Sequence, residues 1–203
     1  MVVAIDGPAG AGKSTVARAV AEELGFTYLD TGAMYRCVGL AAARRGVPAA
    51  VAAREARIVL GERVLLDGED VTVAIRSPQA SEAASRAAAD PDVRSAMVAR
   101  QREIVSTGDW VAEGRDIATA VAPDAAVKVF LTADPAERAR RRAGQIGAEE
   151  AVVAAEQAAR DRRDSTLGRS ALEPAPGAVE LDTTGLPLDA VVERVAALAR
   201  AAR

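Results

Sequence analysis

A glycine-rich stretch near the amino terminus contains residue types that bind phosphate. Residues 7–14 read Gly-Pro-Ala-Gly-Ala-Gly-Lys-Ser and match the pattern G-x-x-x-x-G-K-[ST] at every fixed position. Glycines let main-chain N–H groups surround phosphate oxygens without Cβ clashes, and the positive end of a following helix adds to the attraction. We expect Lys13 to reach the outer phosphates of a nucleoside triphosphate and the Ser14 hydroxyl to hold Mg²⁺.

The surroundings of this stretch favour a phosphate loop over a glycine-rich turn that binds nothing. An apolar run of strand length, residues 2–5, precedes it, and residues 15–24 have helical apolar spacing with Gly25 as the stop. Of the 26 basic residues, Lys13 and Lys128 are the lysines and the rest are arginines. A chain so biased to arginine keeps lysine where a compact point charge suits phosphate better than a planar fork.

Several arginines stand where they could hold charged substrates. Arg115 follows the run 111–114 at the carboxyl end of an expected central strand, beside Asp116. The run 138–142 gives positive charge on more than one face of a helix, which is typical of a lid over phosphates. Most other arginines are better explained as solvated helix residues. We expect four residues to stabilise a transferring phosphoryl group: Lys13, Arg115, Arg138 and Arg142.

The chain has no histidine, and this narrows the chemistry available to it. An alcohol acceptor usually needs a base, although an aspartate could supply one. A phosphate acceptor does not need one, because its second pKa of about 6 leaves the attacking oxygen largely ionised. Two charged phosphates instead require screening by arginines and Mg²⁺. The composition therefore favours transfer to a phosphate.

Two other functional classes are disfavoured. A guanine-specific switch would carry an Asn/Thr-Lys-x-Asp motif, which neither lysine can supply, because Lys13 lies in the loop and Lys128 follows Ala126-Val127. A binding module without catalysis stays open, but the intact loop and the lid-like arginines argue against it.

Composition limits the class of protein further. The chain has 203 residues, half of them hydrophobic but 2% aromatic, which predicts one domain with an aliphatic core. A formal charge of −3 and a pI near 5.2 argue against a general nucleic-acid-binding surface. The single cysteine, Cys37, fits a reducing compartment and a packing role. Since no signal peptide or membrane-spanning run is present, we expect a cytoplasmic protein without membrane or nucleic-acid partners, and a monomer.

Strand-like and helix-like segments alternate along the chain, which predicts an α/β fold with a parallel sheet and ligands beyond the carboxyl ends of its strands. The expected strands are residues 2–5, 26–29, 110–113, 127–131 and 178–181. The expected helices are residues 15–24, 33–45, 48–60, 78–89, 91–105, 149–163 and 187–202, with one more beginning at Asp134-Pro135. Residues 63–66 and 69–73, joined by Asp67-Gly68, predict a small hairpin.

Five longer stretches, taken together, resemble the bacterial cytidylate kinase family. They are IDGPAGAGKST at residues 5–15, LDTGAMYR at 29–36, LDGEDVT at 66–72, EGRDI at 113–117 and VKVFLTA at 127–133. The match runs in order through nearly the whole chain. It is far more specific than the loop alone, which many unrelated NTPases share.

The resemblance implies a P-loop nucleoside monophosphate kinase (NMP kinase) fold. This is an α/β fold with a five-stranded parallel sheet flanked by helices, an NMP-binding insertion with a small β-hairpin, and a short lid. The single kinase domain of residues 1–203 would have its core at about 1–30, 106–136 and 170–203. The NMP-binding subdomain would be about 31–105 and the lid about 137–169.

The reaction implied is transfer of the γ-phosphoryl group of ATP to CMP or dCMP, with Mg²⁺, giving ADP and CDP or dCDP. Another nucleoside monophosphate kinase of the same fold, with UMP, AMP or dTMP as acceptor, stays open as an alternative. A non-catalytic switch also stays open. Carried over position by position, the ATP site would be Gly7, Pro8, Ala9, Gly10, Ala11, Gly12, Lys13, Ser14 and Thr15. The CMP site would be Arg36 and Arg115 on the phosphate with Thr31 nearby, Ser85, Arg94 and Asp116 on the cytosine, and Arg160 and Asp164 on the ribose.

The sequence departs from the family pattern at two positions. After Asp164-Ser165-Thr166 the family usually has an arginine, and here Leu167 stands in its place, with Arg169 two residues further on. We therefore expect Arg169 or a lid arginine to supply the phosphate or lid contact that the family's arginine makes from this segment. The usual glycine after Arg115-Asp116-Ile117 is Ala118, which predicts an ordinary φ there.

Overall fold

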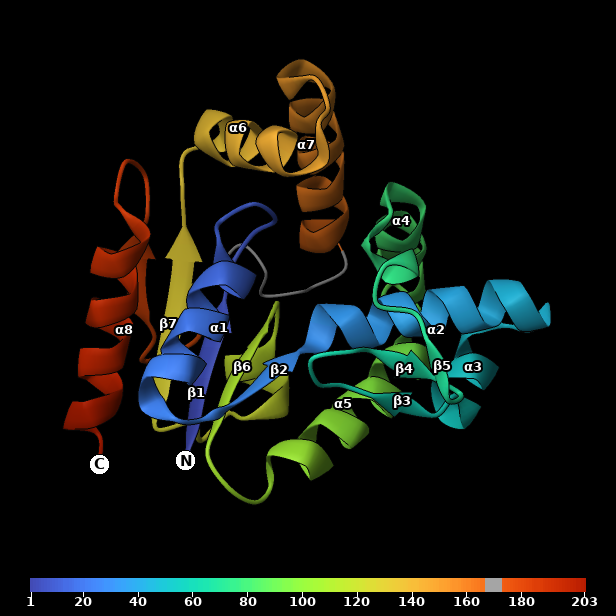
Figure 1. Ribbon diagram of the computed structural model, residues 1–203, viewed down its shortest axis with the longest axis horizontal. Helices are drawn as coiled ribbons and strands as arrows, with labels where there is room; N and C mark the ends of the chain where they lie inside the picture. The colour runs from blue at the N-terminus through green and yellow to red at the C-terminus, as the bar shows by residue number, and fades with distance from the viewer. Residues whose placement is uncertain (167–172) are drawn as a thin grey trace. The chain divides into compact units, whose positions relative to one another are not determined.

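The computed structural model describes residues 1–166 and 173–203, which form two compact units (Figure 1). The first unit consists of Met1–Tyr28 and Gly108–Arg203 and carries the phosphate loop. The second consists of Leu29–Thr107. None of the helices in the described part of the chain is long and apolar enough to cross a membrane.

A five-stranded sheet has the strand order β2-β6-β1-β7-β8. The strands are β1 (Val2–Asp6), β2 (Thr27–Asp30), β6 (Trp110–Gly114), β7 (Val127–Thr132) and β8 (Val179–Asp182). β1 pairs in parallel with β6 and β7, and β7 pairs in parallel with β8. The α/β class and the five-stranded parallel sheet predicted from the sequence are confirmed. Strand β1, which leads into the phosphate loop, is central and apolar, as strands of a sheet buried on both faces are.

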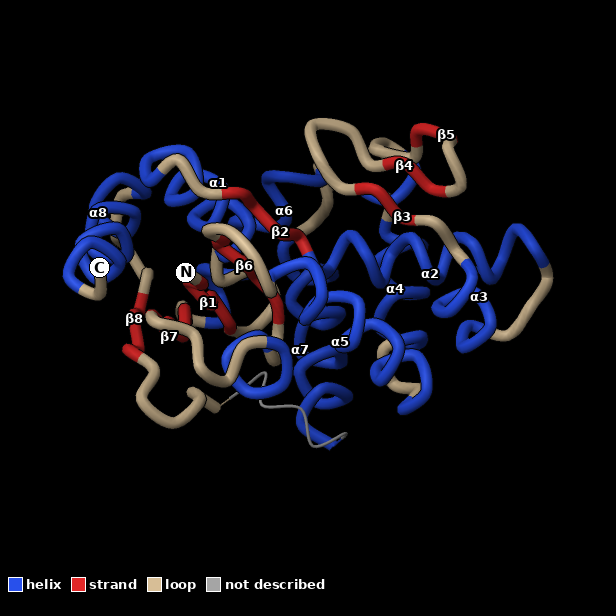
Figure 2. Tube along the Cα trace, turned by 90° about the horizontal axis from the view of Figure 1, so that it is seen from below, coloured by secondary structure: helices blue, strands red, loops and turns tan. Residues whose placement is uncertain are grey.

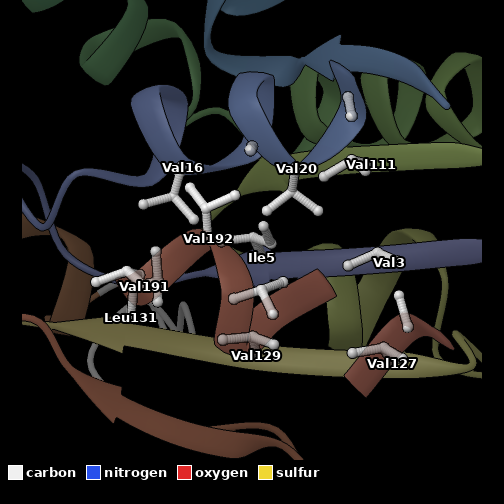
Figure 3. Close-up of a cluster of buried hydrophobic side chains, with 14 of the residues drawn as sticks. Val3, Ile5, Val16, Val20, Val111, Val127, Val129, Leu131, Val191 and Val192 are labelled. Carbon is white, nitrogen blue, oxygen red and sulfur yellow. The ribbon is translucent and has the colours of Figure 1, made fainter. Parts of the chain in front are cut away.

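The core of the first unit is aliphatic, as the composition predicts. Helices α1 (Lys13–Leu24) and α8 (Leu188–Ala201) pack against the sheet with small branched side chains, as Figure 3 shows. The buried residues labelled there are Val3, Ile5, Val16, Val20, Val111, Val127, Val129, Leu131, Val191 and Val192. Phe26 is the one aromatic side chain among the buried residues of this cluster. Burying such side chains stabilises the fold by about 1.5–3 kcal/mol each.

Two further helices, α6 (Pro135–Ile146) and α7 (Glu150–Thr166), lie beyond the carboxyl end of β7 in Figure 1. Asp134 caps α6 by accepting from the Ala136 N–H group at 2.8 Å. A small apolar cluster joins the two helices. A buried ion pair strengthens the joint: Arg138 Nη1 donates to Asp161 Oδ2 at 2.8 Å, with side-chain exposures of 10% and 13%.

The second unit consists mainly of helices, with a small antiparallel sheet (Figure 2). Its elements are α2 (Thr31–Arg45), α3 (Ala49–Glu55), β3 (Ile58–Val59), β4 (Leu65–Leu66), β5 (Glu69–Asp70), the 3₁₀ turn η1 (Ala74–Arg76), α4 (Pro78–Ala87) and α5 (Pro91–Val105). Ser77 and Asp90 accept main-chain N–H bonds ahead of Pro78 and Pro91. Both predicted helix starts are confirmed. Cys37 packs fully buried in α2, as expected.

The expectation of a helix over residues 48–60 is wrong at its carboxyl end. Helix α3 stops at Glu55, and Ile58 pairs with Leu66 as a third strand beside the hairpin. The Asp67 side chain accounts for the difference, because its Oδ1 accepts from the Arg57 N–H group at 3.0 Å. This contact holds the chain extended where local periodicity favours a helix. The Asp-Gly turn itself is confirmed, since Asp67 and Gly68 have φ angles of 54° and 90°.

The segment after β6 forms a five-residue π-helical turn, η2 (Ile117–Val121), which the sequence analysis does not predict. Ala118 lies within it and is not among the positive-φ residues of the described chain, so the expectation of an ordinary φ is confirmed. Such turns are rare and are frequently found at functional sites.

Replacing Gly7 by alanine should destabilise the protein strongly. Its φ is +146°, and an added Cβ would lie 2.0 Å from the Leu131 carbonyl oxygen of β7. We expect Gly7→Ala to lower the free energy of unfolding by about 3 kcal/mol. Gly25→Ala is the control, because φ is +68° there but nothing lies within 4 Å. The control should cost about 1 kcal/mol. Equal urea midpoints for the two variants would contradict the close approach to Leu131.

Breaking the ion pair between α6 and α7 should also be costly. Arg138→Gln leaves the Asp161 carboxylate buried without its cation, which should lower the free energy of unfolding by about 3 kcal/mol. The matched control is Arg140→Gln, since Arg140 is 65% exposed and pairs with Glu137 on its own helix. That change should cost less than about 0.5 kcal/mol in urea unfolding. Similar losses for both variants would count against the buried pair.

Candidate active site

The glycine-rich stretch forms a loop between β1 and α1, in the structural context that the motif requires. Gly10 and Gly12 adopt φ angles of 80° and 88°, which side chains rarely tolerate, and Gly12 is the N-cap of α1. Lys13 opens the helix, and its ammonium group donates to the Pro8 carbonyl oxygen at 2.8 Å. The side chain therefore folds back over the loop.

Ser14 contacts a carboxylate that sequence reasoning missed. Its hydroxyl donates to Glu113 Oε1 at 2.8 Å, and the Tyr28 hydroxyl lies 3.4 Å from the same oxygen. Glu113 is 5% exposed and stands in β6, otherwise an apolar strand. A buried acid within an apolar strand is the signal that could have identified it. The Ser14 hydroxyl of α1 and the Glu113 carboxylate of β6 thus place two hard oxygen groups side by side, of the kind that bind Mg²⁺.

Asp6 ends β1 and binds the turn after β6. Its Oδ1 accepts from the Ile117 N–H group at 2.9 Å and its Oδ2 from the Ala118 N–H group at 2.8 Å. Burial raises the pKa of Asp6 to about 6, against the lowering effect of these two bonds. The pKa of Asp6 in the folded protein exceeds the unfolded value of 3.8. The protonated carboxyl group therefore contributes stability below pH 3.8, and this contribution is lost as the pH rises through about 6. At neutral pH the buried charge therefore opposes folding.

Arg115 and Asp116 lie at the carboxyl edge of the sheet, where the sequence analysis places them. They follow β6 directly, and Arg115 Nη1 donates to the Gly7 carbonyl oxygen at 3.3 Å. In the pairing of β1 with β6, Asp6 lies opposite Gly114. The structure therefore brings Arg115 together with the phosphate loop.

The arginines of α6 have separate environments. Arg138 is 8% exposed, and its Nη1 also donates to the Ala9 carbonyl oxygen of the loop at 2.9 Å. Arg141 donates from Nη1 to the Thr183 hydroxyl at 2.9 Å and from Nη2 to the Thr183 carbonyl at 2.7 Å. Arg142 lies half-buried on the same helix. Arg138 thus binds the main chain of the loop, a position that its helical spacing alone does not reveal.

Predicted acceptor-site residues of the second unit occupy its helices. Thr31 and Ser85 are buried on α2 and α4, and Arg94 is half-buried on α5. Arg36 pairs with Asp30 at 3.1 Å, and its buried Nε has no acceptor among the described residues. Gly32 leaves room for this guanidinium, since a Cβ there would meet Arg36 Nη1 at 3.1 Å.

Four positions in or after α7 cannot be placed in the site. Arg160 and Asp164 belong to α7, but their side chains lie outside what the structure describes. Leu167 and Arg169 lie outside the described residues altogether.

Comparisons with known proteins show the family of this chain. The family model for cytidylate kinase matches residues 3–201. A cytidylate kinase of Solibacter usitatus is 50% identical and covers 98% of this chain and 92% of its own. One from Pelotomaculum thermopropionicum is 47% identical, covering 99% and 96%. A gluconokinase structure from Sinorhizobium meliloti 1021 matches 99% of this chain and 93% of its own, at a TM-score of 0.56 and 19% identity, which shows the fold alone. With its phosphate loop, parallel sheet and full-length match, the chain belongs to the cytidylate kinase family.

Proposed function

We propose that this protein transfers the γ-phosphoryl group of ATP to CMP or dCMP, giving ADP and CDP or dCDP. Membership of the cytidylate kinase family supports the proposal. The observation that carries it is a hydrogen bond at the edge of the sheet. Arg115, which follows β6, donates to the Gly7 carbonyl oxygen of the phosphate loop, which follows β1. Groups suited to a donor triphosphate and to a second anion are thus held by neighbouring strands.

Transfer of the phosphoryl group requires mainly the stabilisation of negative charge. The loop amides and Lys13 would bind the β- and γ-phosphates of ATP, while Arg115 and Arg142 would offset charge on the transferring group. Arg138 would act through the loop, because it holds the Ala9 carbonyl oxygen. No general base is required when the acceptor is a phosphate already ionised near neutral pH.

The residues present fit a magnesium ion. Ser14 would hold it, and the Glu113 carboxylate, 2.8 Å from the Ser14 hydroxyl, adds the hard oxygen character that Mg²⁺ prefers. When bound, the ion would neutralise charge on the phosphate oxygens. In the described chain no cluster of three or more acidic or cysteine side chains offers an alternative site.

The second unit would supply residues of the acceptor site. Arg36 supports this assignment best, because its buried Nε has no acceptor within residues 1–166 and 173–203, and a phosphate oxygen would supply one. The remaining assignments rest on the family resemblance: Thr31 near the phosphate, Ser85, Arg94 and Asp116 on cytosine, and Arg160 and Asp164 on ribose. On the same ground residues 31–105 would form the NMP-binding subdomain and 137–169 the lid, in a monomeric cytoplasmic enzyme.

An acceptor panel tests the proposal. ADP release from ATP and Mg²⁺ is followed in a coupled assay with CMP, dCMP, UMP, AMP and dTMP. We expect kcat/KM for CMP or dCMP to exceed that for AMP and dTMP by at least about a hundredfold, because a site that hydrogen-bonds one base rejects others strongly. A higher value for another base would assign the chain a different acceptor, and no turnover with any of them would favour a non-catalytic switch.

Lys13→Ala should lower kcat by about a thousandfold or more while the protein stays folded, because the ammonium group stabilises the phosphates during transfer. The other lysine supplies the control. Lys128 lies on β7 and contacts the Pro176 carbonyl oxygen at 3.5 Å, so Lys128→Ala should leave kcat within about twofold. Circular dichroism checks folding. Retained turnover in Lys13→Ala would remove the lysine from the mechanism.

A further inference from the structure

Asp6 is a buried acid that binds main-chain donors at the edge of the site. It is 5% exposed, and each of its carboxylate oxygens accepts one N–H group of the π-helical turn, from Ile117 at 2.9 Å and from Ala118 at 2.8 Å. The turn begins directly after Arg115 and Asp116. One side chain therefore fixes the main chain immediately beyond the arginine.

The two bonds require a carboxylate. An amide of the same shape has one acceptor oxygen, and its NH₂ group would face the second N–H donor. Desolvation raises the pKa of Asp6 to about 6, so the charge that both bonds need is present at neutral pH in spite of its burial. An uncharged residue would be easier to bury, and a group that opposes folding in this way is typical of a functional position.

The next residue completes the link. The Gly7 carbonyl oxygen accepts from Arg115 Nη1 at 3.3 Å. Asp6, the last residue of β1, and Gly7, the next residue, thus bind two parts of the same short segment. Asp6 accepts from the N–H groups of residues 117 and 118, and the Gly7 carbonyl oxygen accepts from the Arg115 guanidinium.

We propose that Asp6 is a positioning residue for phosphoryl transfer, whose carboxylate fixes the 115–118 turn and thereby orients the Arg115 guanidinium toward the acceptor phosphate. The inference rests on the proposed function for the identity of that phosphate. It requires no contact between Asp6 and either substrate.

The kinetic test is Asp6→Asn. We expect kcat/KM for CMP to fall at least tenfold with a raised KM for CMP, while KM for MgATP stays within twofold because the loop residues are unchanged. The lost main-chain hydrogen bond lowers the urea midpoint at neutral pH and removal of the buried charge raises it, so the midpoint should change little. Asp70→Asn is the control: this exposed carboxylate also holds a main-chain N–H, that of Thr72 at 2.9 Å, and its loss should leave the kinetics unchanged. Unchanged kcat/KM in folded Asp6→Asn, or equal rises in both KM values, would overturn the proposal.

A second measurement starts from the wild-type protein and needs no substrate. In NMR spectra of the wild-type protein, lowering the pH from about 8 to about 5 should shift the Ile117 and Ala118 amide resonances. The Arg115 Nε–H resonance should follow with the same midpoint. The charged groups that act on Asp6 are Asp116 and Lys13, so the titration is repeated with Asp116→Asn to separate that carboxyl. An Arg115 resonance that does not follow would overturn the link, whereas failure of CMP turnover in the wild type would reject only the proposed function.

Discussion

The parallel pairing of β1 with β6 and β7 determines where the charged groups of the site lie. Asp6 lies opposite Gly114 on one side and Phe130 on the other, so the three strands end at one edge. The phosphate loop, the Arg115 turn and the segment leading to α6 all leave the sheet there. A slip of one residue would turn every side chain to the opposite face and separate these groups. The apolar strands are therefore as necessary to the site as the residues that would touch phosphate.

Main-chain carbonyl oxygens hold three arginines of the first unit. Arg115 contacts the Gly7 carbonyl, Arg138 the Ala9 carbonyl and Arg141 the Thr183 carbonyl. A loop that turns its N–H groups toward phosphate directs some carbonyl oxygens away from it, and these need donors. Guanidinium groups supply such donors in a fixed fork. Part of the arginine excess in this chain therefore serves the loop itself.

Features that depend on local chemistry could be predicted from the sequence. Ser77 and Asp90 mark helix starts because their side chains satisfy amides of the next turn, and Asp67-Gly68 marks a hairpin because both residues tolerate positive φ. Features that depend on distant partners could not. The strand at Ile58 exists through its pairing with Leu66, and Glu113 joins the site through Ser14, 99 positions earlier. Ser85 and Arg94 read as ordinary helix residues, and the family resemblance alone singles them out.

The scarcity of aromatic and sulfur side chains has a practical consequence. The single tryptophan, Trp110, opens β6 in the first unit, and the single cysteine, Cys37, lies fully buried in α2 of the second. Burial raises the pKa of the Cys37 thiol to about 11, so little of its reactive thiolate forms while the side chain stays buried. Indole fluorescence thus reports on one unit and thiol labelling on the other. The native chain already carries an optical and a chemical reporter with which the cooperativity of the two halves can be followed independently.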